Sequence, residues 1–417
     1  MSALRHHPWQ FFKREVLLPA EGRFAALDGL RALAALLVVG FHCASFTAPP
    51  FADARDTLPL GIIQWILVRS WMGADIFFVL SGFLIGRGLL EQLRTSRIGF
   101  RAFYIRRAFR IFPAYYVVLA LSLCVFARWG NLIIYFAAPW ASLFSNSWAN
   151  FFYLNNYMPL QPTAMGWGWS LCIEEHFYLT LPAFLTLLFR WARGWQRAAV
   201  LTGSALLPLT FRAVAFIREP SLILFGPIYY NSQTHCDGLL IGVLIAYAYV
   251  YHREAFAHVV VRLGAFWWIA GCASVAAAFW WGSMFRAAAF PVTVELFVLA
   301  VGAGLLLINC LFLKNRVTRL FACPVWSAPA RLSYGIYLVH PIVLSFVLAR
   351  WPGGVAAAGS SVKQLLAFVA IVALVSAAVA LVMFLVLERP MLRLGARLSR
   401  RYVPPATMAA PRGVPLL

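Results

Sequence analysis

The chain has 417 residues, of which 62% are hydrophobic and only 12% charged, and its formal net charge is +21. Soluble domains are about 25% charged, so this chain has too few polar residues to cover a water-soluble body of its size. Apolar runs long enough to cross a bilayer recur along the sequence, and most basic residues lie in the short segments between them. The composition excludes a soluble protein, and it explains the positive charge by membrane topology instead of nucleic-acid binding.

In chain order, the sequence predicts an all-α, polytopic membrane protein with about ten transmembrane helices. Residues 1–26 form a basic cytoplasmic segment without a signal-peptide cleavage pattern, so the first helix is expected to be retained. The transmembrane domain is predicted over residues 27–390, and a basic, Pro-containing cytoplasmic tail over 391–417. The ten spans are predicted at residues 27–47, 71–89, 111–129, 168–189, 198–217, 235–252, 263–281, 293–313, 332–350 and 365–387.

For two further apolar segments, the sequence leaves open whether they span the membrane. Segment 58–70 is short and follows a polar stretch, which favours an interfacial or re-entrant segment. Segment 132–158 is aromatic but contains Pro139 and several asparagines, and it is either an eleventh span or an outer loop. We favour a partly buried outer loop, because a span at that point would invert every later loop.

The basic residues predict the orientation of the chain. With ten spans and the N-terminus inside, 26 Lys and Arg residues lie on the cytoplasmic side and 8 on the outer side, while Arg31 lies within the first span. This asymmetry favours an N-in, C-in protein of the cell (inner) membrane. The seven cysteines are scattered and form no C-x-x-C pair, so we expect neither a disulfide framework nor a metal site.

The first span carries a basic and an imidazole side chain on one face. Arg31 and His42 are eleven residues apart, which is close to three helical turns and about 16 Å along the axis. In the predicted orientation Arg31 lies near the cytoplasmic end and His42 lies deep, towards the outer side. A single histidine in a span is often a packing residue, but the matched arginine and the small residues between them favour a functional role.

The next two spans add further candidates. Asp75 starts the second span at outer depth, and Ser81 and Gly82 lie near its middle, where they favour either close helix packing or a passage for a ligand. The basic sequence I-R-R-A-F-R directly precedes the third span, and its guanidinium groups suit phosphate or simply anchor the helix at the inner membrane surface. These arginines are Arg106, Arg107 and Arg110.

Acidic residues recur at the outer ends of later spans. Glu174 lies near the start of the fourth span and Asp237 near the start of the sixth, at a depth comparable with His42. His340 in the ninth span is interpreted as structural, and Glu388 is expected to pair with Arg389. The sequence thus predicts a basic inner layer that would bind an anionic cofactor, and an outer layer where a carboxylate could orient a histidine base.

Together these residues resemble the membrane-bound acyltransferase 3 family, bacterial enzymes that O-acylate surface polysaccharides, nodulation glycolipids and macrolide sugars. The resemblance covers residues 24–390 and depends on several motifs in order. They are R-x10-H at Arg31–His42, D-x-F-F-x-x-S-G-F-L at Asp75–Leu84, R-x-x-R-I-x-P-x-Y at Arg107–Tyr115, W-S-L-x-x-E-x-x-F-Y-L at Trp169–Leu179, D-x-L-x-x-G from Asp237, and S-Y-G-I-Y-L-x-H at Ser333–His340.

The resemblance implies an acyl-CoA donor, commonly acetyl-CoA, with His42 as the essential base and the arginines at the donor site. One position departs from the family pattern, because His235 stands where members often carry an arginine two residues before the aspartate. Some members have an additional extracytoplasmic hydrolase-like domain, which is not expected here because the chain ends soon after its last span.

The resulting hypothesis is a membrane-bound O-acyltransferase. The CoA phosphates would bind Arg106, Arg107, Arg110 and Arg31, and the pantetheine arm would pass Ser81 and Gly82. His42 would deprotonate a hydroxyl of a glycan or lipid-linked sugar. A carboxylate would orient the His42 ring, and the sequence does not decide among Asp75, Glu174 and Asp237. Direct transfer and an acyl-enzyme both stay open. Aromatic residues that would stack on sugars, or equally lie in the membrane interface, are Trp140, Trp148, Tyr153, Tyr157 and Trp167.

Two other functions fit the same pattern. Buried charges at two depths also describe a transporter or flippase, although no repeated halves are visible in the sequence. A scaffold protein would tolerate substitution of His42 and Arg31. Neither a nucleic acid nor a metal is expected as a partner.

Overall fold

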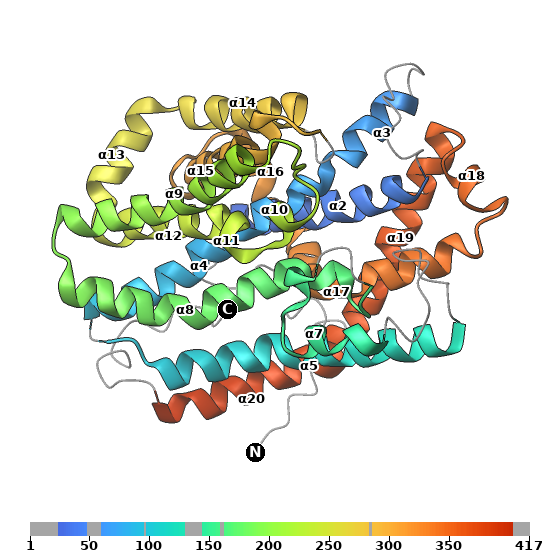
Figure 1. Ribbon diagram of the computed structural model, residues 1–417. Coiled ribbons are helices and arrows are strands. Elements are labelled where there is room, and N and C mark those ends of the chain that lie inside the picture. Colours follow the sequence, from blue (N-terminus) through green and yellow to red (C-terminus); the bar gives the residue numbers. More distant parts are fainter. Residues whose placement is uncertain are drawn as a thin grey trace.

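The computed structural model describes residues 24–47, 60–95, 97–129, 144–158, 162–282 and 286–402. Within these ranges every regular element is helical, and the long helices lie side by side (Figure 1). Among the described residues, eight helical stretches are long and apolar enough to cross a membrane. They comprise α2 (Ala25–Thr47), α3 (Leu60–Val68) with α4 (Gly73–Thr95), α5 (Phe100–Trp129), α8 (Trp169–Trp191), α9 (Trp195–Arg218), α15 (Glu295–Phe312), α17 (Ser327–Leu348) and α19 (Val362–Met383).

The remaining two predicted spans are also helical but less regular. Helices α13 (Arg253–Leu263) and α14 (Phe266–Trp281) meet at an angle of 78° and together are apolar enough for one span. Helix α12 (Asp237–Tyr251) has only 15 residues. Each predicted span therefore coincides with a helix, which confirms an all-α, polytopic membrane protein, while the N-in, C-in orientation stays a prediction.

Shorter helices connect these elements. They are α7 (Trp148–Phe151), α10 (Pro227–Tyr230), α11 (Ser232–His235), α16 (Arg316–Phe321), α18 (Gly354–Ala358) and α20 (Arg389–Ser399), with 3-10 turns at Ser70–Met72, Asn155–Tyr157, Gly166–Gly168, Pro324–Trp326 and Arg400–Tyr402 and π-turns at Phe290–Val294 and Phe384–Glu388. Helix α20 lies alongside α5 at the bottom of Figure 1.

Of segment 58–70, which was predicted to be interfacial or re-entrant, residues 60–70 continue into the second span as a helical run, and residues 58–59 lie outside the described residues. From Leu60 the chain runs through α3 and a short 3-10 turn into α4, and Leu60–Thr95 qualifies as one span of 36 residues. Arg69 and Ser70 are the polar residues between α3 and α4. Of segment 132–158, residues 144–158 form only short helical turns instead of a span, and residues 132–143 lie outside the described part of the chain.

Helices α9 and α19 present apolar surfaces suited to contact with lipid. In each, only 22% of the most apolar stretch is buried within the molecule. Large apolar side chains on both are exposed, among them Leu207, Phe211 and Ile217 on α9 and Leu374 and Val382 on α19. Because exposed apolar faces of this length are stable only in hydrocarbon, these two helices belong to the lipid-facing side of the bundle.

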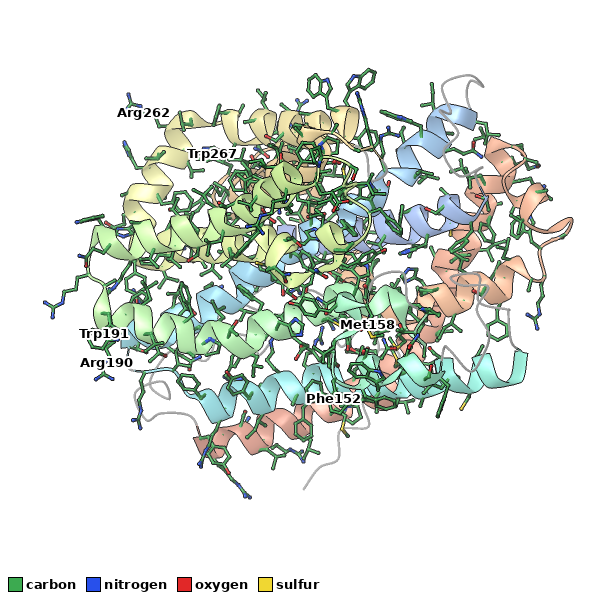
Figure 2. All side chains as sticks on the ribbon, in the orientation of Figure 1. Phe152, Met158, Arg190, Trp191, Arg262 and Trp267 are labelled. Carbon is green, nitrogen blue, oxygen red and sulfur yellow. The ribbon has the colours of Figure 1, made fainter. Side chains whose placement is uncertain are left out.

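Charged and aromatic residues gather at one end of the molecule. Figure 2 shows Arg190 and Trp191 at the last turn of α8, and Arg262 and Trp267 around the bend between α13 and α14, all towards the left end. Arginine and tryptophan are the residues that favour a membrane–water interface. This end corresponds to the side that the sequence predicts to be cytoplasmic.

Glycines bring α4 and α12 into close contact. A Cβ atom at Gly82 would overlap the carbonyl oxygen of Leu239, and one at Gly242 would overlap the carbonyl oxygen of Val79. Small residues permit such backbone contact between helices in a membrane. Of the two alternatives for Gly82, helix packing is therefore the one the structure supports, and the prediction that Gly82 borders a passage for the cofactor is corrected.

Replacing Gly82 by Ala should destabilise the protein, because the new methyl group meets backbone atoms that cannot rotate away. Overpacking of this kind costs about 1–3 kcal/mol or more, so the midpoint of thermal unfolding in detergent should fall. Gly88→Ala is the matched control on the same helix, since a Cβ there has no heavy atom within 4 Å. Equal midpoints for the two variants would contradict the packing role of Gly82.

Candidate active site

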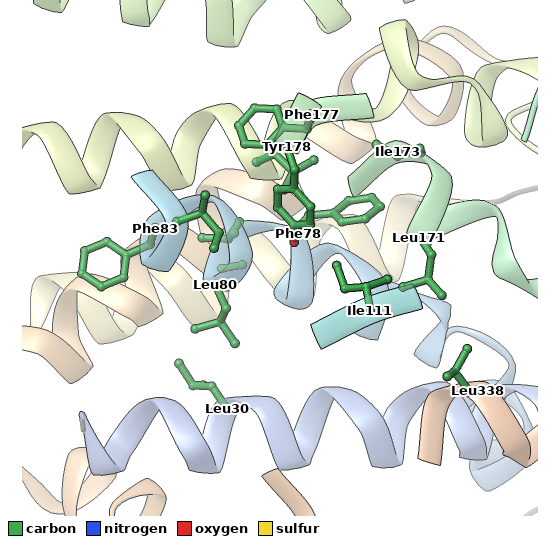
Figure 3. Close-up of a cluster of buried hydrophobic side chains, with 14 of the residues drawn as sticks. Leu30, Phe78, Leu80, Phe83, Ile111, Leu171, Ile173, Phe177, Tyr178 and Leu338 are labelled. Carbon is green, nitrogen blue, oxygen red and sulfur yellow. The ribbon is translucent and has the colours of Figure 1, made fainter. Parts of the chain in front are cut away.

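Side chains of five helices line a cavity of about 130 Å³. Arg31 lines it from α2, Arg107 and Arg110 from α5, Glu174 and Tyr178 from α8, and Ser81 from α4, while α17 supplies Ser333, Tyr334 and Tyr337. Figure 3 shows the apolar part of the wall, where Phe78, Ile111, Leu171 and Tyr178 come together from α4, α5 and α8. The structure thus brings together three of the four arginines expected at the donor site, with Ser81.

Tyr178 joins three of these helices. Its hydroxyl donates a hydrogen bond of 2.6 Å to Oε2 of Glu174, and Ser81 Oγ also hydrogen-bonds to that hydroxyl. Since the phenol hydrogen is directed at Glu174, Ser81 donates to the phenol oxygen. The guanidinium carbon of Arg107 lies 4.1 Å from the centroid of the Tyr178 ring. Tyr178 therefore holds an acidic and a basic side chain of the cavity wall in fixed positions.

The remaining arginines differ in their surroundings. Arg110 lies 4.0 Å from Oε2 of Glu388, so the partner of Glu388 is Arg110 and the predicted pair with Arg389 is wrong. Nε of Arg107 is buried and has no hydrogen-bond partner among the described residues. Arg106 belongs to α5 but is not part of the cavity wall, and this departs from its expected place beside Arg107 and Arg110.

His42 pairs with another histidine. Its Nδ1 lies 2.9 Å from Nε2 of His340 on α17 and 2.9 Å from the carbonyl oxygen of Val38. His340 is completely buried, and its Nδ1 lies 2.8 Å from the carbonyl oxygen of Tyr337. His42 is half-buried. Tyr337 itself lines the cavity, so one turn of α17 connects the cavity wall to the histidine pair.

The three candidate carboxylates have other partners. Oδ1 of Asp75 lies 3.0 Å from Nε2 of His235, Asp237 binds Arg212, and Glu174 binds Tyr178. None of the hydrogen bonds that these three residues make within the described chain goes to His42. The expectation that one of them orients His42 is therefore corrected, because all three side chains bind other neighbours.

Arg212 is one of the eight basic residues counted on the outer side in the predicted orientation, and it is completely buried. It makes hydrogen bonds of 2.7 and 2.8 Å to the two carboxylate oxygens of Asp237, and its Nε donates to the carbonyl oxygen of Thr293 at 2.8 Å. Both members of the pair are at most 1% exposed. An arginine inside an apolar run such as 195–218 is a signal for a buried ion pair, and it was available in the sequence.

His235 completes this second polar cluster. Nδ1 of His235 lies 2.5 Å from the carbonyl oxygen of Tyr229, and its ring stacks on Trp169 at a centroid distance of 5.5 Å. The cluster formed by Asp75, His235, Arg212 and Asp237 joins α4, α9, α11 and α12. It holds the irregular junction between α11 and α12 in place.

The aromatic residues of the predicted outer loop divide into two groups. Trp148 and Tyr157 are about half exposed, whereas Trp167 and Tyr153 are buried. Trp167 donates its Nε1 hydrogen to the carbonyl oxygen of Leu338, and Tyr153 stacks on Tyr115 at a centroid distance of 4.3 Å. Burial raises the pKa of the Tyr153 hydroxyl, so it stays protonated. Only Trp148 and Tyr157 present an accessible ring, and Trp140 lies outside the described residues.

Comparison with known proteins identifies the chain's relatives. The family described as "Acyltransferase domain" matches residues 24–387. The Listeria monocytogenes "Peptidoglycan O-acetyltransferase" is 28% identical over 55% of this chain and 34% of its own length. A Staphylococcus aureus protein named "Putative O-acetyltransferase" is 26% identical over 79% of this chain and 52% of its own length. The chain spans about half the length of these curated relatives or less, and no solved structure matches it.

The family match covers nearly the whole described region, so the chain belongs to this acyltransferase family. Among the described residues, no group of three or more His, Cys, Asp or Glu side chains is arranged to hold a metal ion.

The Arg212–Asp237 pair predicts a specific result in a double-mutant cycle. Arg212→Leu or Asp237→Leu alone should each destabilise the protein by about 3–5 kcal/mol, because each leaves one buried charge without its counterion. The double variant should unfold at a higher temperature than either single variant, since no charge is then left unpaired. Thermal unfolding in detergent measures this, and strictly additive losses would show that the two side chains do not interact.

Proposed function

We propose that this member of the acyltransferase family moves an acyl group from a cytoplasmic acyl-CoA to a hydroxyl of a cell-surface glycan, and that this acyl group is acetyl. The observation that carries the proposal is the cavity whose wall combines Arg31, Arg107 and Arg110 within the family's matched region. The Listeria monocytogenes relative named as a peptidoglycan O-acetyltransferase supports acetyl as the group and a peptidoglycan sugar as the acceptor. The enzyme would work in the cell (inner) membrane.

The charge of the cavity supports an anionic donor. Its wall contains three guanidinium groups and one carboxylate, that of Glu174. Guanidinium forks bind phosphate oxygens with two parallel hydrogen bonds. The buried Nε of Arg107, which has no partner among the described residues, would be satisfied by such an oxygen. Arg31, Arg107 and Arg110 are therefore proposed to bind the phosphate-bearing part of the donor.

The shape of the cavity supports an acyl thioester on a narrow arm. Its wall follows α4 from Ala74 to Ile85, which corresponds to about 16 Å along a helix. A wall of this length suits an extended, unbranched chain. The pantetheine arm would lie along Ser81, and the glycan would approach from the predicted outer side, where Trp148 and Tyr157 expose their rings.

His42 is proposed as the base. It would take the proton of the acceptor hydroxyl while the oxygen attacks the thioester carbonyl, and the carbon–sulfur bond would break to release CoA as a thiolate. His42 is half-buried, whereas its partner His340 is completely buried. Direct transfer and a covalent acyl-enzyme both agree with these residues.

Removal of the base tests the proposal. Purified His42→Ala should elute as a monodisperse species in detergent but lose acyl transfer by about 10²- to 10⁴-fold, the usual contribution of general acid–base catalysis. The assay follows transfer of labelled acetyl from acetyl-CoA to purified muropeptides. His258→Ala, at an exposed position on α13, is the control. Full activity of His42→Ala would remove His42 from the mechanism.

The donor site has its own test. Arg107→Ala and Arg110→Ala should each raise the KM for acetyl-CoA at least about tenfold, as expected for loss of one charge-assisted contact, and leave the KM for the acceptor unchanged. Arg106→Ala removes a neighbouring charge that is not in the cavity wall, so its effect on the donor KM should be smaller. Equal effects of all three variants, or equal effects on donor and acceptor, would indicate that the arginines only anchor α5.

A further inference from the structure

We propose that His340 is a positioning residue for this reaction: it fixes the tautomer of His42, so that Nε2 of His42 is the nitrogen that takes the acceptor's proton. The inference rests on the proposed function, in which His42 is the base. It assigns a role to a buried histidine that the sequence pattern had suggested to be structural.

The first step concerns Nδ1 of His340. This nitrogen lies 2.8 Å from the carbonyl oxygen of Tyr337 and 3.2 Å from that of Ile336. A carbonyl oxygen only accepts hydrogen bonds, so Nδ1 must carry a hydrogen. His340 is completely buried, which makes an unsatisfied or wrongly protonated ring nitrogen costly.

The sequence explains why the Tyr337 carbonyl is available. In an α-helix this oxygen would accept a hydrogen bond from the backbone N–H four residues later, at position 341. That residue is Pro341, which lies inside α17 and has no N–H. The freed carbonyl therefore accepts from the side chain of His340. The adjacent pair His340–Pro341 thus places a donor beside the acceptor that the proline leaves open.

The second step concerns the two facing nitrogens. A neutral His340 with its hydrogen on Nδ1 has a lone pair on Nε2, and this atom lies 2.9 Å from Nδ1 of His42. Nδ1 of His42 must then be the donor, and the same hydrogen is also directed at the carbonyl oxygen of Val38, 2.9 Å away. Neutral His42 therefore carries its hydrogen on Nδ1, and its Nε2 is the unprotonated, basic nitrogen.

The arrangement also suits the charged state. When His42 has taken the acceptor's proton, its Nδ1 hydrogen still points to Nε2 of His340, so the imidazolium keeps its hydrogen bond. In the Ser-His-Asp triad an aspartate has this role of fixing the tautomer and orientation of the base. A neutral imidazole fulfils it here without a buried negative charge, which would be costly at this depth.

Two substitutions separate the contact to His42 from the contact to the backbone. The amide nitrogen of Asn occupies the place of Nδ1, so His340→Asn can still donate to Tyr337 but does not reach His42. The side-chain oxygen of Gln occupies the place of Nε2, so His340→Gln can accept from His42. We expect His340→Asn to lower kcat about 10²- to 10⁴-fold at unchanged KM values, and His340→Gln to restore kcat to within about tenfold of the native enzyme.

Nuclear magnetic resonance of ¹⁵N-histidine-labelled protein gives a readout apart from activity. The signals of His42 are assigned from their absence in His42→Ala. The native protein should show Nδ1 of His42 protonated and Nε2 unprotonated, and His340→Asn should show a mixture of tautomers. His258→Asn, on exposed α13, controls for the loss of one histidine and should leave both readouts unchanged.

If His340→Asn does not fold, Pro341→Ala tests the same point. This variant supplies a backbone N–H that competes with His340 for the Tyr337 carbonyl. It should give a mixture of His42 tautomers and a lowered kcat.

The outcomes separate this inference from the proposed function. If His42→Ala is inactive but His340→Asn keeps the native kcat, or if His340→Gln is as impaired as His340→Asn, the positioning role is overturned while His42 stays the base. A native tautomer in both His340→Asn and Pro341→Ala overturns it as well. If His42→Ala transfers acetyl normally, the proposed function of His42 fails, whatever tautomer the spectra show, and the positioning role fails with it.

Discussion

Inside a hydrocarbon layer a polar side chain needs a protein partner, because no water is present to satisfy it. This requirement decides where the charged residues of this chain lie. Arg212 neutralises Asp237, His235 meets Asp75, and Arg110 approaches Glu388. The pairs of Asp75 with His235 and of Arg110 with Glu388 join helices that are distant in the sequence. They consequently help to select which helices pack together, in addition to satisfying their own charges.

The cavity wall departs from this balance. Its guanidinium groups outnumber its carboxylates, and one buried guanidinium nitrogen, Nε of Arg107, has no hydrogen-bond partner among the described residues. Leaving a buried N–H without a hydrogen-bond partner costs about 1–3 kcal/mol. A phosphate oxygen of the proposed donor would accept from this N–H. Binding of the donor would then remove this cost.

The sequence predicted the positions of the helices better than it predicted which side chains contact each other. Long apolar runs with polar boundaries are sufficient to place the spans, since burial in lipid depends on composition and length. The grouping of Arg31, Arg107 and Arg110 was predictable too, because all three belong to the same polar layer. Depth, however, does not give the direction in which a side chain points around its helix. Asp75 and Asp237 were therefore predicted at the depth of His42, but they bind His235 and Arg212.

The contact between His42 and His340 depends on which helices pack together, and a pattern along the chain does not contain that information. His42 and His340 are 298 residues apart, and their contact depends on α2 packing beside α17, an order that hydropathy does not specify. One local signal was nevertheless present, since the proline after His340 predicts a free carbonyl one turn earlier. Tyr337 provides that carbonyl and also lines the cavity with its ring. The residue that orients the histidine pair thus also borders the proposed donor site, so a movement of α17 would change the position of the base and the shape of the cavity together.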